Sequence, residues 1–175
     1  MNVAKSLRVL IVGCFGWVLF LGPVASAKRR PDHPYRYSVL DTPVSLAIGT
    51  VLTPEFPVES KWYWIMVQVE KPLPFMEMVC MMGVTSGPFE QSHCRSDDPL
   101  LRADWTVWND DHLVSSGSST TEADGLFTNK YIFKFLGKFP GEAGKKYVVK
   151  VNFTGDGAPL NAANPHLIVV KIGDE

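Results

Sequence analysis

The hydrophobic pattern is strongest between Lys61 and Met82, and we expect the rest of the chain to be arranged around this stretch. Residues 62–70 are mostly aromatic or β-branched, which favours a pleated strand. Side chains alternate along a strand, so one face should be buried throughout and the other only at its start. The first face carries Tyr63, Ile65, Val67 and Val69, and the second carries Trp62, Trp64, Met66, Gln68 and Glu70.

A second central strand is predicted at residues 76–82, after Pro72 and Pro74 end the first. In this interpretation Met76, Met78, Cys80 and Met82 share one face. A helix is the alternative for these residues, although the prolines and the turn at 85–88 argue against a long one.

Turn-forming residues divide the rest of the chain into short segments with strand-like patterns. Residues 147–153 alternate most clearly between apolar and polar positions. Further strands are predicted at 35–40, 44–52, 100–108, 112–116, 131–136 and 167–172, and turns or loops at 41–43, 83–98, 109–111, 117–125, 137–146 and 155–165. Short strands at this spacing, without a long helix, predict an all-β antiparallel sandwich of about seven to eight strands, in a single domain covering residues 35–175.

The last third of the chain combines Gly144-Lys145-Lys146-Tyr147 and the apolar run 148–153 with Pro159-Leu160, Asn164-Pro165-His166-Leu167 and the run 168–172. This order resembles the last hairpin of immunoglobulin-like domains, and it is similar in particular to small bacterial exported or lipoprotein domains. The resemblance implies an immunoglobulin-like sandwich in which Tyr147 is a tyrosine corner, with its hydroxyl bonded to backbone a few residues upstream. It implies no catalytic residues. The cysteines depart from the antibody pattern, because they are too close in sequence to join two sheets.

The N-terminus has the three parts of a secretory signal. Residues 2–8 contain two basic residues and no acid, residues 9–24 are almost wholly apolar, and Ala25-Ser26-Ala27 fits a signal-peptidase site. We predict a signal peptide at 1–27, a loose leader at 28–34, and a periplasmic or secreted protein. Two alternatives stay open, which are lipidation at Cys14 and retention of residues 9–27 as a membrane anchor, since basic residues at 28–30 resist translocation.

Cysteine usage agrees with export. Removal of the signal peptide leaves Cys80 and Cys94, an even pair that predicts one disulfide in an oxidising compartment. Chain entropy gives about 3 kcal/mol for closing so short a loop. A redox or metal pair is the alternative, although the spacing is not C-x-x-C. The net charge of −1 gives no sign of nucleic-acid binding.

Three methionines are candidate metal ligands. If Met76, Met78 and Met82 face solvent, their thioethers suit Cu(I), a soft ion. The alternative is that they fill gaps in the core. The histidines at 33, 93, 112 and 166 have no metal-ligand spacing.

Tryptophans and loops supply the candidate binding residues. Trp62 and Trp64 share a face about 7 Å apart by strand rise, and if exposed they would form a sugar-stacking platform or a protein hot spot. Trp105 and Trp108 are three residues apart, so a regular strand places them on opposite faces and makes Trp108 a candidate surface aromatic. His166 closes the loop 154–166, and loops held by rigid sheets commonly carry binding.

The sequence contains neither a G-x-S-x-G elbow nor a Gly-rich phosphate loop, so we predict no catalysis and no cofactor. We expect a non-catalytic envelope or secreted domain that binds a protein partner in the cell envelope, as an inhibitor or immunity protector does. The alternatives are a copper-binding envelope protein using residues 76–82 and a carbohydrate-binding module.

Overall fold

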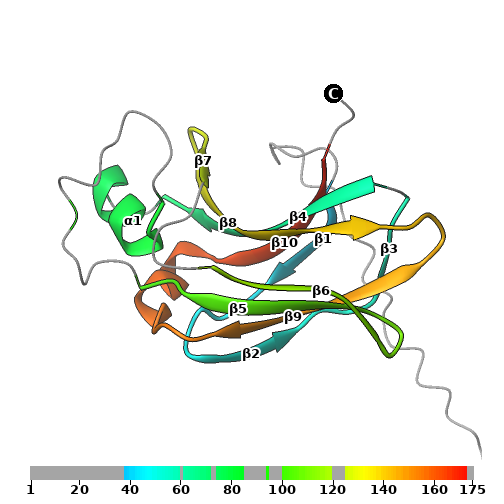
Figure 1. The fold of residues 1–175 in the computed structure, drawn as a ribbon. Coiled ribbons are helices and arrows are strands. Elements are labelled where there is room, and N and C mark those ends of the chain that lie inside the picture. The colour runs from blue at the N-terminus through cyan, green and yellow to red at the C-terminus, as the bar shows by residue number, and fades with distance from the viewer. Residues whose placement is uncertain are drawn as a thin grey trace, which may run out of the picture.

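The structure, a computed structural model, describes residues 38–59, 61–71, 74–84, 94, 100–119 and 125–172. Two antiparallel β-sheets face each other, and an α-helix lies at one end of them (Figure 1). The predicted all-β antiparallel sandwich is therefore confirmed, although ten strands form where seven to eight were expected. The predicted signal peptide and leader, residues 1–34, lie outside the described residues.

The first sheet has the strand order β1-β10-β4-β8-β7. Its strands are β1 (Ser38–Pro43), β4 (Lys61–Glu70), β7 (Gly125–Phe127), β8 (Tyr131–Gly141) and β10 (His166–Lys171). β4 is the expected central strand, and its predicted inward face is buried throughout. Its outward face runs opposite to the prediction, since Trp62 at the start is exposed while Met66 and Gln68 are buried. The reason is a second apolar cluster on this outer face, in which Met66 packs with Phe133 and Ile168 of the neighbouring strands.

The second sheet has the order β2-β9-β5-β6, with β3 also pairing to β9. Its strands are β2 (Gly49–Leu52), β3 (Phe56–Pro57), β5 (Ala103–Asn109), β6 (His112–Ser119) and β9 (Lys146–Phe153). β9 shows the predicted alternation, with Tyr147, Val149, Val151 and Phe153 buried. The turn predicted at 109–111 is confirmed, and Asp110 takes the left-handed conformation there with a φ of 50°. Asp tolerates that conformation better than most residues.

The second strand predicted at 76–82 is wrong, because these residues form the helix α1 (Phe75–Met82). Pro74 precedes the helix in an extended conformation, and Gly83 ends it with a φ of 64°. Met78 and Met82, four residues apart, fall on the same buried face of the helix. The apolar residues of a run of Met, Val and Cys fit the repeat of a strand and the repeat of a helix equally well. The flanking Pro74 and Gly83 favour the helix.

Several predicted turns are occupied by strand. β1 continues through residues 41–43, where Pro43 is tolerated because β1 lies at the edge of the sheet. β8 runs on to Gly141, and an irregularity in its pairing at Ile65 and Met66 lets it follow β4 to the end. β6 likewise extends to Ser119, while residues 120–124 and most of the loop predicted at 83–98 are not described.

The last hairpin expected from the immunoglobulin-like resemblance is wrong. β9 belongs to the second sheet and β10 to the first, and the short 3-10 helix η2 (Ala158–Ala163) carries the chain between them. The hydrogen bond expected of Tyr147 is nevertheless present, since its Oη accepts the Glu142 backbone N–H at 3.0 Å. Tyr63 repeats the arrangement by accepting the Glu59 N–H at 2.9 Å. Phe139 packs between the two tyrosine rings, with centroids 5.4 and 5.6 Å away.

Trp105 fills the space between the sheets. Its Nε1–H donates to the Leu136 carbonyl at 2.8 Å, which satisfies its polar atom in the core. Gly117 and Gly137 leave room for the ring, because a Cβ on them would lie 2.7 and 2.1 Å from the Trp105 Cζ2 atom. These two glycines let β6 and β8 close over the indole.

The predicted disulfide is confirmed, since Cys80 of α1 is bonded to Cys94 with their Cα atoms 5.3 Å apart. Such a bond indicates an oxidising, non-cytoplasmic compartment. Among the described residues, no helix has the length and apolar character needed to cross a membrane.

Candidate functional site

The four binding candidates from the sequence do not converge on one site. Trp62 and Trp64 lie on the outer face of the first sheet, and His166 lies beneath its surface. Trp108 lies on the outer face of the second sheet and Trp105 faces the core, so the two lie on opposite faces, as their spacing predicted.

Trp62 and Trp64 share a face but differ in exposure. Trp62 is 47% exposed, and the Lys138 Nζ lies 5.4 Å from its ring centroid. Trp64 is half-buried, with its ring 4.8 Å from that of Phe135. One exposed ring therefore stands beside one packed ring, and the two do not form a continuous stacking platform.

His166 is only 4% exposed. Its Nδ1 lies 2.5 Å from the Asp41 Oδ1, a pairing that fixes the ring inside the first sheet. Its Nε2 and the Oε1 of its cross-strand neighbour Gln68 are buried and find no hydrogen-bond partner among the residues that the structure describes. Because the ring is enclosed, His166 is not a surface contact for a large partner.

The methionines do not form the exposed thioether cluster that the copper hypothesis requires. Met78 and Met82 are fully buried in the main core, and Met76 is half-buried. In the part of the chain that the structure describes, no three His, Cys, Asp or Glu side chains gather as a possible metal site. We therefore do not propose copper binding.

Lys134 is a buried charge that sequence reasoning missed. It lies on the inner face of β8, fully buried, and its Nζ donates to the Leu101 carbonyl at 2.8 Å. Burial, and secondarily the nearby Arg102, lowers the pKa of Lys134 from 10.5 to about 8. The alternation of β8 places it inward, but nothing in its sequence neighbourhood distinguishes it from a surface lysine.

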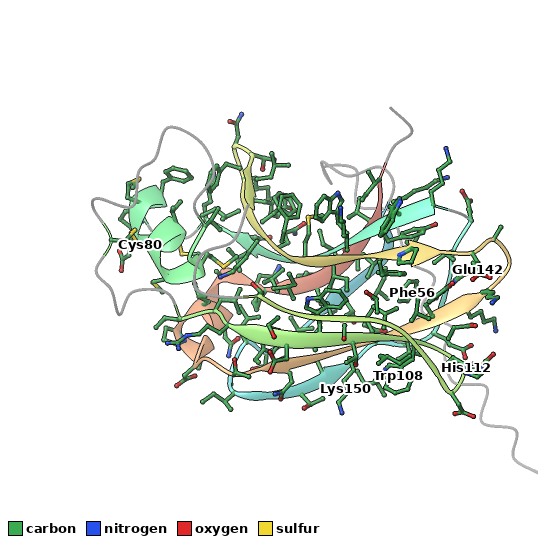
Figure 2. The ribbon with its side chains drawn as sticks, in the orientation of Figure 1. Phe56, Cys80, Trp108, His112, Glu142 and Lys150 are labelled. Carbon is green, nitrogen blue, oxygen red and sulfur yellow. A yellow bond between two sulfur atoms is a disulfide. The ribbon has the colours of Figure 1, made fainter. Side chains whose placement is uncertain are left out.

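The outer face of the second sheet carries a partly exposed apolar group on three neighbouring strands. Trp108 of β5 lies directly opposite Val148 of β9 on one side and Leu113 of β6 on the other. We call these three residues the Trp108 patch. Leu113 is 53% exposed, and Trp108 and Val148 are half-buried. Figure 2 shows Trp108 and Lys150 on the side of this sheet that faces away from the first sheet.

Polar side chains surround the Trp108 patch and hold its ring. The Trp108 Nε1–H donates to the Thr106 Oγ1 at 3.0 Å, so the indole lies along its own strand. Lys150 stands opposite Thr106 on β9 and is exposed. One row further along the strands, the Ser118 hydroxyl donates to the Asp104 Oδ1 at 2.6 Å. The patch is therefore an apolar centre with a hydrogen-bonded polar border.

Charged residues flank the other end of the Trp108 patch. Lys146 and Glu55 form an ion pair of 3.3 Å in which both side chains are more than half exposed. The turn that joins β5 to β6 adds the exposed Asp110, Asp111 and His112. Exposed pairs of this kind contribute little to stability, so these charges are available to select a partner.

Part of the Trp108 patch could have been predicted from the sequence. A turn of two residues at 110–111 sets the register of a hairpin, so it places Leu113 opposite Trp108. Val148 could not be added in the same way, because the pairing of β5 with β9 joins segments forty residues apart.

Neither a protein-family model nor a curated protein matches this sequence. Among solved structures, the chain is similar to GEBA250068378 from Sulfurospirillum deleyianum, at 10% sequence identity and a TM-score of 0.55. The match covers 77% of this chain and 98% of the other. At such low identity the likeness concerns the fold alone.

Proposed function

We propose that this chain is a non-catalytic, periplasmic or secreted domain, and that it binds a protein partner at the Trp108 patch. The observation that carries the proposal is a tryptophan with aliphatic neighbours on both flanks, on the outer sheet face near the β5–β6 turn and within a polar border. Protein interfaces commonly have this anatomy, with an aromatic anchor at the centre and polar residues at the rim. The secretory signal and the disulfide support the compartment.

The Trp108 patch is also rigid, which favours tight binding even when the contact area is small. The Trp108 indole is already held by Thr106, and its strand is paired on both sides, so little conformational entropy is lost on binding. Such a preformed face suits an inhibitor or immunity-protector role, in which a stable domain blocks an enzyme or toxin of the envelope. Truncation of a tryptophan anchor commonly costs about 2 kcal/mol or more, which is roughly a thirtyfold loss of affinity.

Site-specific photo-crosslinking tests the proposal. A photoreactive phenylalanine analogue is placed at Leu113 in the full chain, in cells that make the protein naturally. The matched control carries it at Leu126 of β7, a leucine in the first sheet that is 40% exposed. We expect one envelope protein to be captured from Leu113 and not from Leu126, with the yield strongly reduced by Trp108→Ala. Equal capture from both positions, or no effect of Trp108→Ala, would contradict the proposal.

A carbohydrate ligand is a second candidate for the same face. Thr106 and Lys150 place hydrogen-bonding groups beside the indole on neighbouring strands, and sugars stack on aromatic rings while their hydroxyls bond to such groups. Glycan-array binding by the full chain that is lost in Trp108→Ala and kept in Trp62→Ala would favour this candidate.

A further inference from the structure

β2 forms one margin of the second sheet. It pairs with β9 on one side, and Figure 1 shows it along the outer edge of that sheet. An exposed strand edge offers backbone N–H and C=O groups to any other strand.

The direction of these groups follows from the pairing with β9. The Thr53 N–H donates to the Val149 carbonyl at 3.0 Å, and the Val149 N–H returns to the Thr53 Oγ1 at 2.9 Å. Backbone groups alternate along an antiparallel strand, so Val51 also points toward β9. Thr50 and Leu52 consequently direct their N–H and C=O groups to the open edge.

This edge lacks the usual protection. Natural edge strands carry charges, prolines or bulges that discourage further pairing. Residues 48–52 read Ile-Gly-Thr-Val-Leu, without charge or proline, and the pairing of β2 with β9 has no shift in register. By contrast, the edge strand β1 carries Asp41 and Pro43 and has an irregular register near its start. Leu52 of β2 is 65% exposed, and Ile48, in the bend just before Gly49, is 67% exposed.

The exposed residues of this segment are symmetric about Thr50, with an aliphatic residue two positions away on each side. We propose that β2 pairs antiparallel with β2 of a second copy of this chain, with Thr50 opposite Thr50. Such an arrangement has twofold symmetry, as the interfaces of most homodimers do. The same segment of a second copy therefore supplies the matching residues, whereas the strand of an unrelated protein would not be expected to do so.

In this register the two Thr50 residues exchange a pair of backbone hydrogen bonds. Ile48, in the bend that precedes β2, then lies near Leu52 of the other copy, so each exposed aliphatic side chain gains an apolar neighbour. Because β2 contains no charge, the pairing brings no like charges together. The contact is nevertheless short, and it buries well below the roughly 800 Å² per partner of a standard interface. We therefore expect a reversible dimer with a dissociation constant in the micromolar range or weaker.

The dimer contact is separate from the Trp108 patch. It uses Thr50 and Leu52 of β2, whereas the patch lies on β9, β5 and β6. Pairing at β2 joins the two second sheets edge to edge, so both patches lie on one continuous outer face. Failure of dimerisation would leave the proposed partner binding untouched, and the reverse also holds.

Sedimentation of the purified chain, expressed from Met1, over about 1 µM to 1 mM tests the contact. We expect a monomer–dimer equilibrium that Leu52→Lys weakens at least tenfold, because the charge would lie in the pairing edge. Ser116→Lys is the matched control, since Ser116 lies in the same cross-strand row at the opposite margin of the sheet and is exposed. Unchanged melting temperatures would show that both variants fold.

Cysteine crosslinking gives a second measurement. Thr50→Cys should form a disulfide-linked dimer under mild oxidation faster than Ser118→Cys, because residues opposite each other in a hydrogen-bonded pair have Cα atoms about 5.5 Å apart. A wild-type chain that stays monomeric over the whole range, with equal crosslinking of the two cysteine variants, would overturn the proposal. A dimer that persists in Leu52→Lys would overturn it too, because the contact would then lie elsewhere.

Discussion

Replacing Lys134 with methionine should remove a large pH-dependent contribution to stability. Lys134 is fully buried on β8, and its pKa is lowered from 10.5 to about 8, chiefly by burial and secondarily by Arg102. Methionine has a similar length and no ionisable group, so Lys134→Met isolates the ammonium.

The sign follows from the protons bound in each state. Between pH 8 and 10.5 the amine is neutral in the folded chain and protonated in the unfolded chain, so unfolding takes up a proton. The free energy of unfolding therefore rises with pH through this window. Below pH 8 both states are protonated, and the folded state carries the whole cost of burying the charge. The full difference is about 3 kcal/mol, of which about 2.5 kcal/mol develops between pH 7 and 10.

Urea unfolding at pH 7, 8, 9 and 10 measures this contribution. We expect the wild-type free energy of unfolding to gain about 2.5 kcal/mol over this range relative to Lys134→Met. The comparison with the variant cancels other groups that titrate in the same range. Lys150→Met, which removes an exposed ammonium from β9, is the matched control and should give a curve parallel to the wild type. Parallel curves for wild type and Lys134→Met would show that the Lys134 charge is not desolvated in the folded chain.

Two further substitutions test the packing that holds the candidate surfaces in place. Tyr147→Phe should lower the free energy of unfolding by about 1 kcal/mol, because the Glu142 N–H loses its acceptor. Thermal or urea unfolding measures this loss, and no change would mean that water replaces the hydroxyl without cost. Gly137→Ala should lower the free energy of unfolding by about 3 kcal/mol, since the new methyl would lie 2.1 Å from the Trp105 ring. The near-ultraviolet circular dichroism should also change as the indole moves. An unchanged spectrum and an unchanged stability would contradict this account.

The alternation of apolar and polar residues was enough to predict the strands that bury one face against the core. β4 and β9 carry apolar residues at every second position, and both lie in the middle of a sheet, where that pattern is required. The same alternation placed Trp105 and Trp108 on opposite faces, and burial in the structure decides that Trp108 is the outer one.

The failures have physical causes outside the local pattern. Residues 76–82 fit a strand and a helix equally well by apolar content, and Pro74 and Gly83 decided between them. The assignment of β9 and β10 to opposite sheets depends on partners far away in sequence, which periodicity does not report. The open edge at β2 was missed for the same reason, because strand order alone determines which strand is left at a margin.

The strand order also dictates when the molecule can acquire its shape. β1, the first described strand, has β10 as its neighbour in the sheet, and β10 is the last strand that the structure describes. The centre of the second sheet depends in the same way on β9. Neither layer can be completed until the final strands have emerged from the ribosome or from a translocation channel. A chain that crosses a membrane in an unfolded state gains from this delay, because premature compaction would block its passage. The pairing of β1 with β10 places the risk of aggregation in the interval before residues 166–171 arrive.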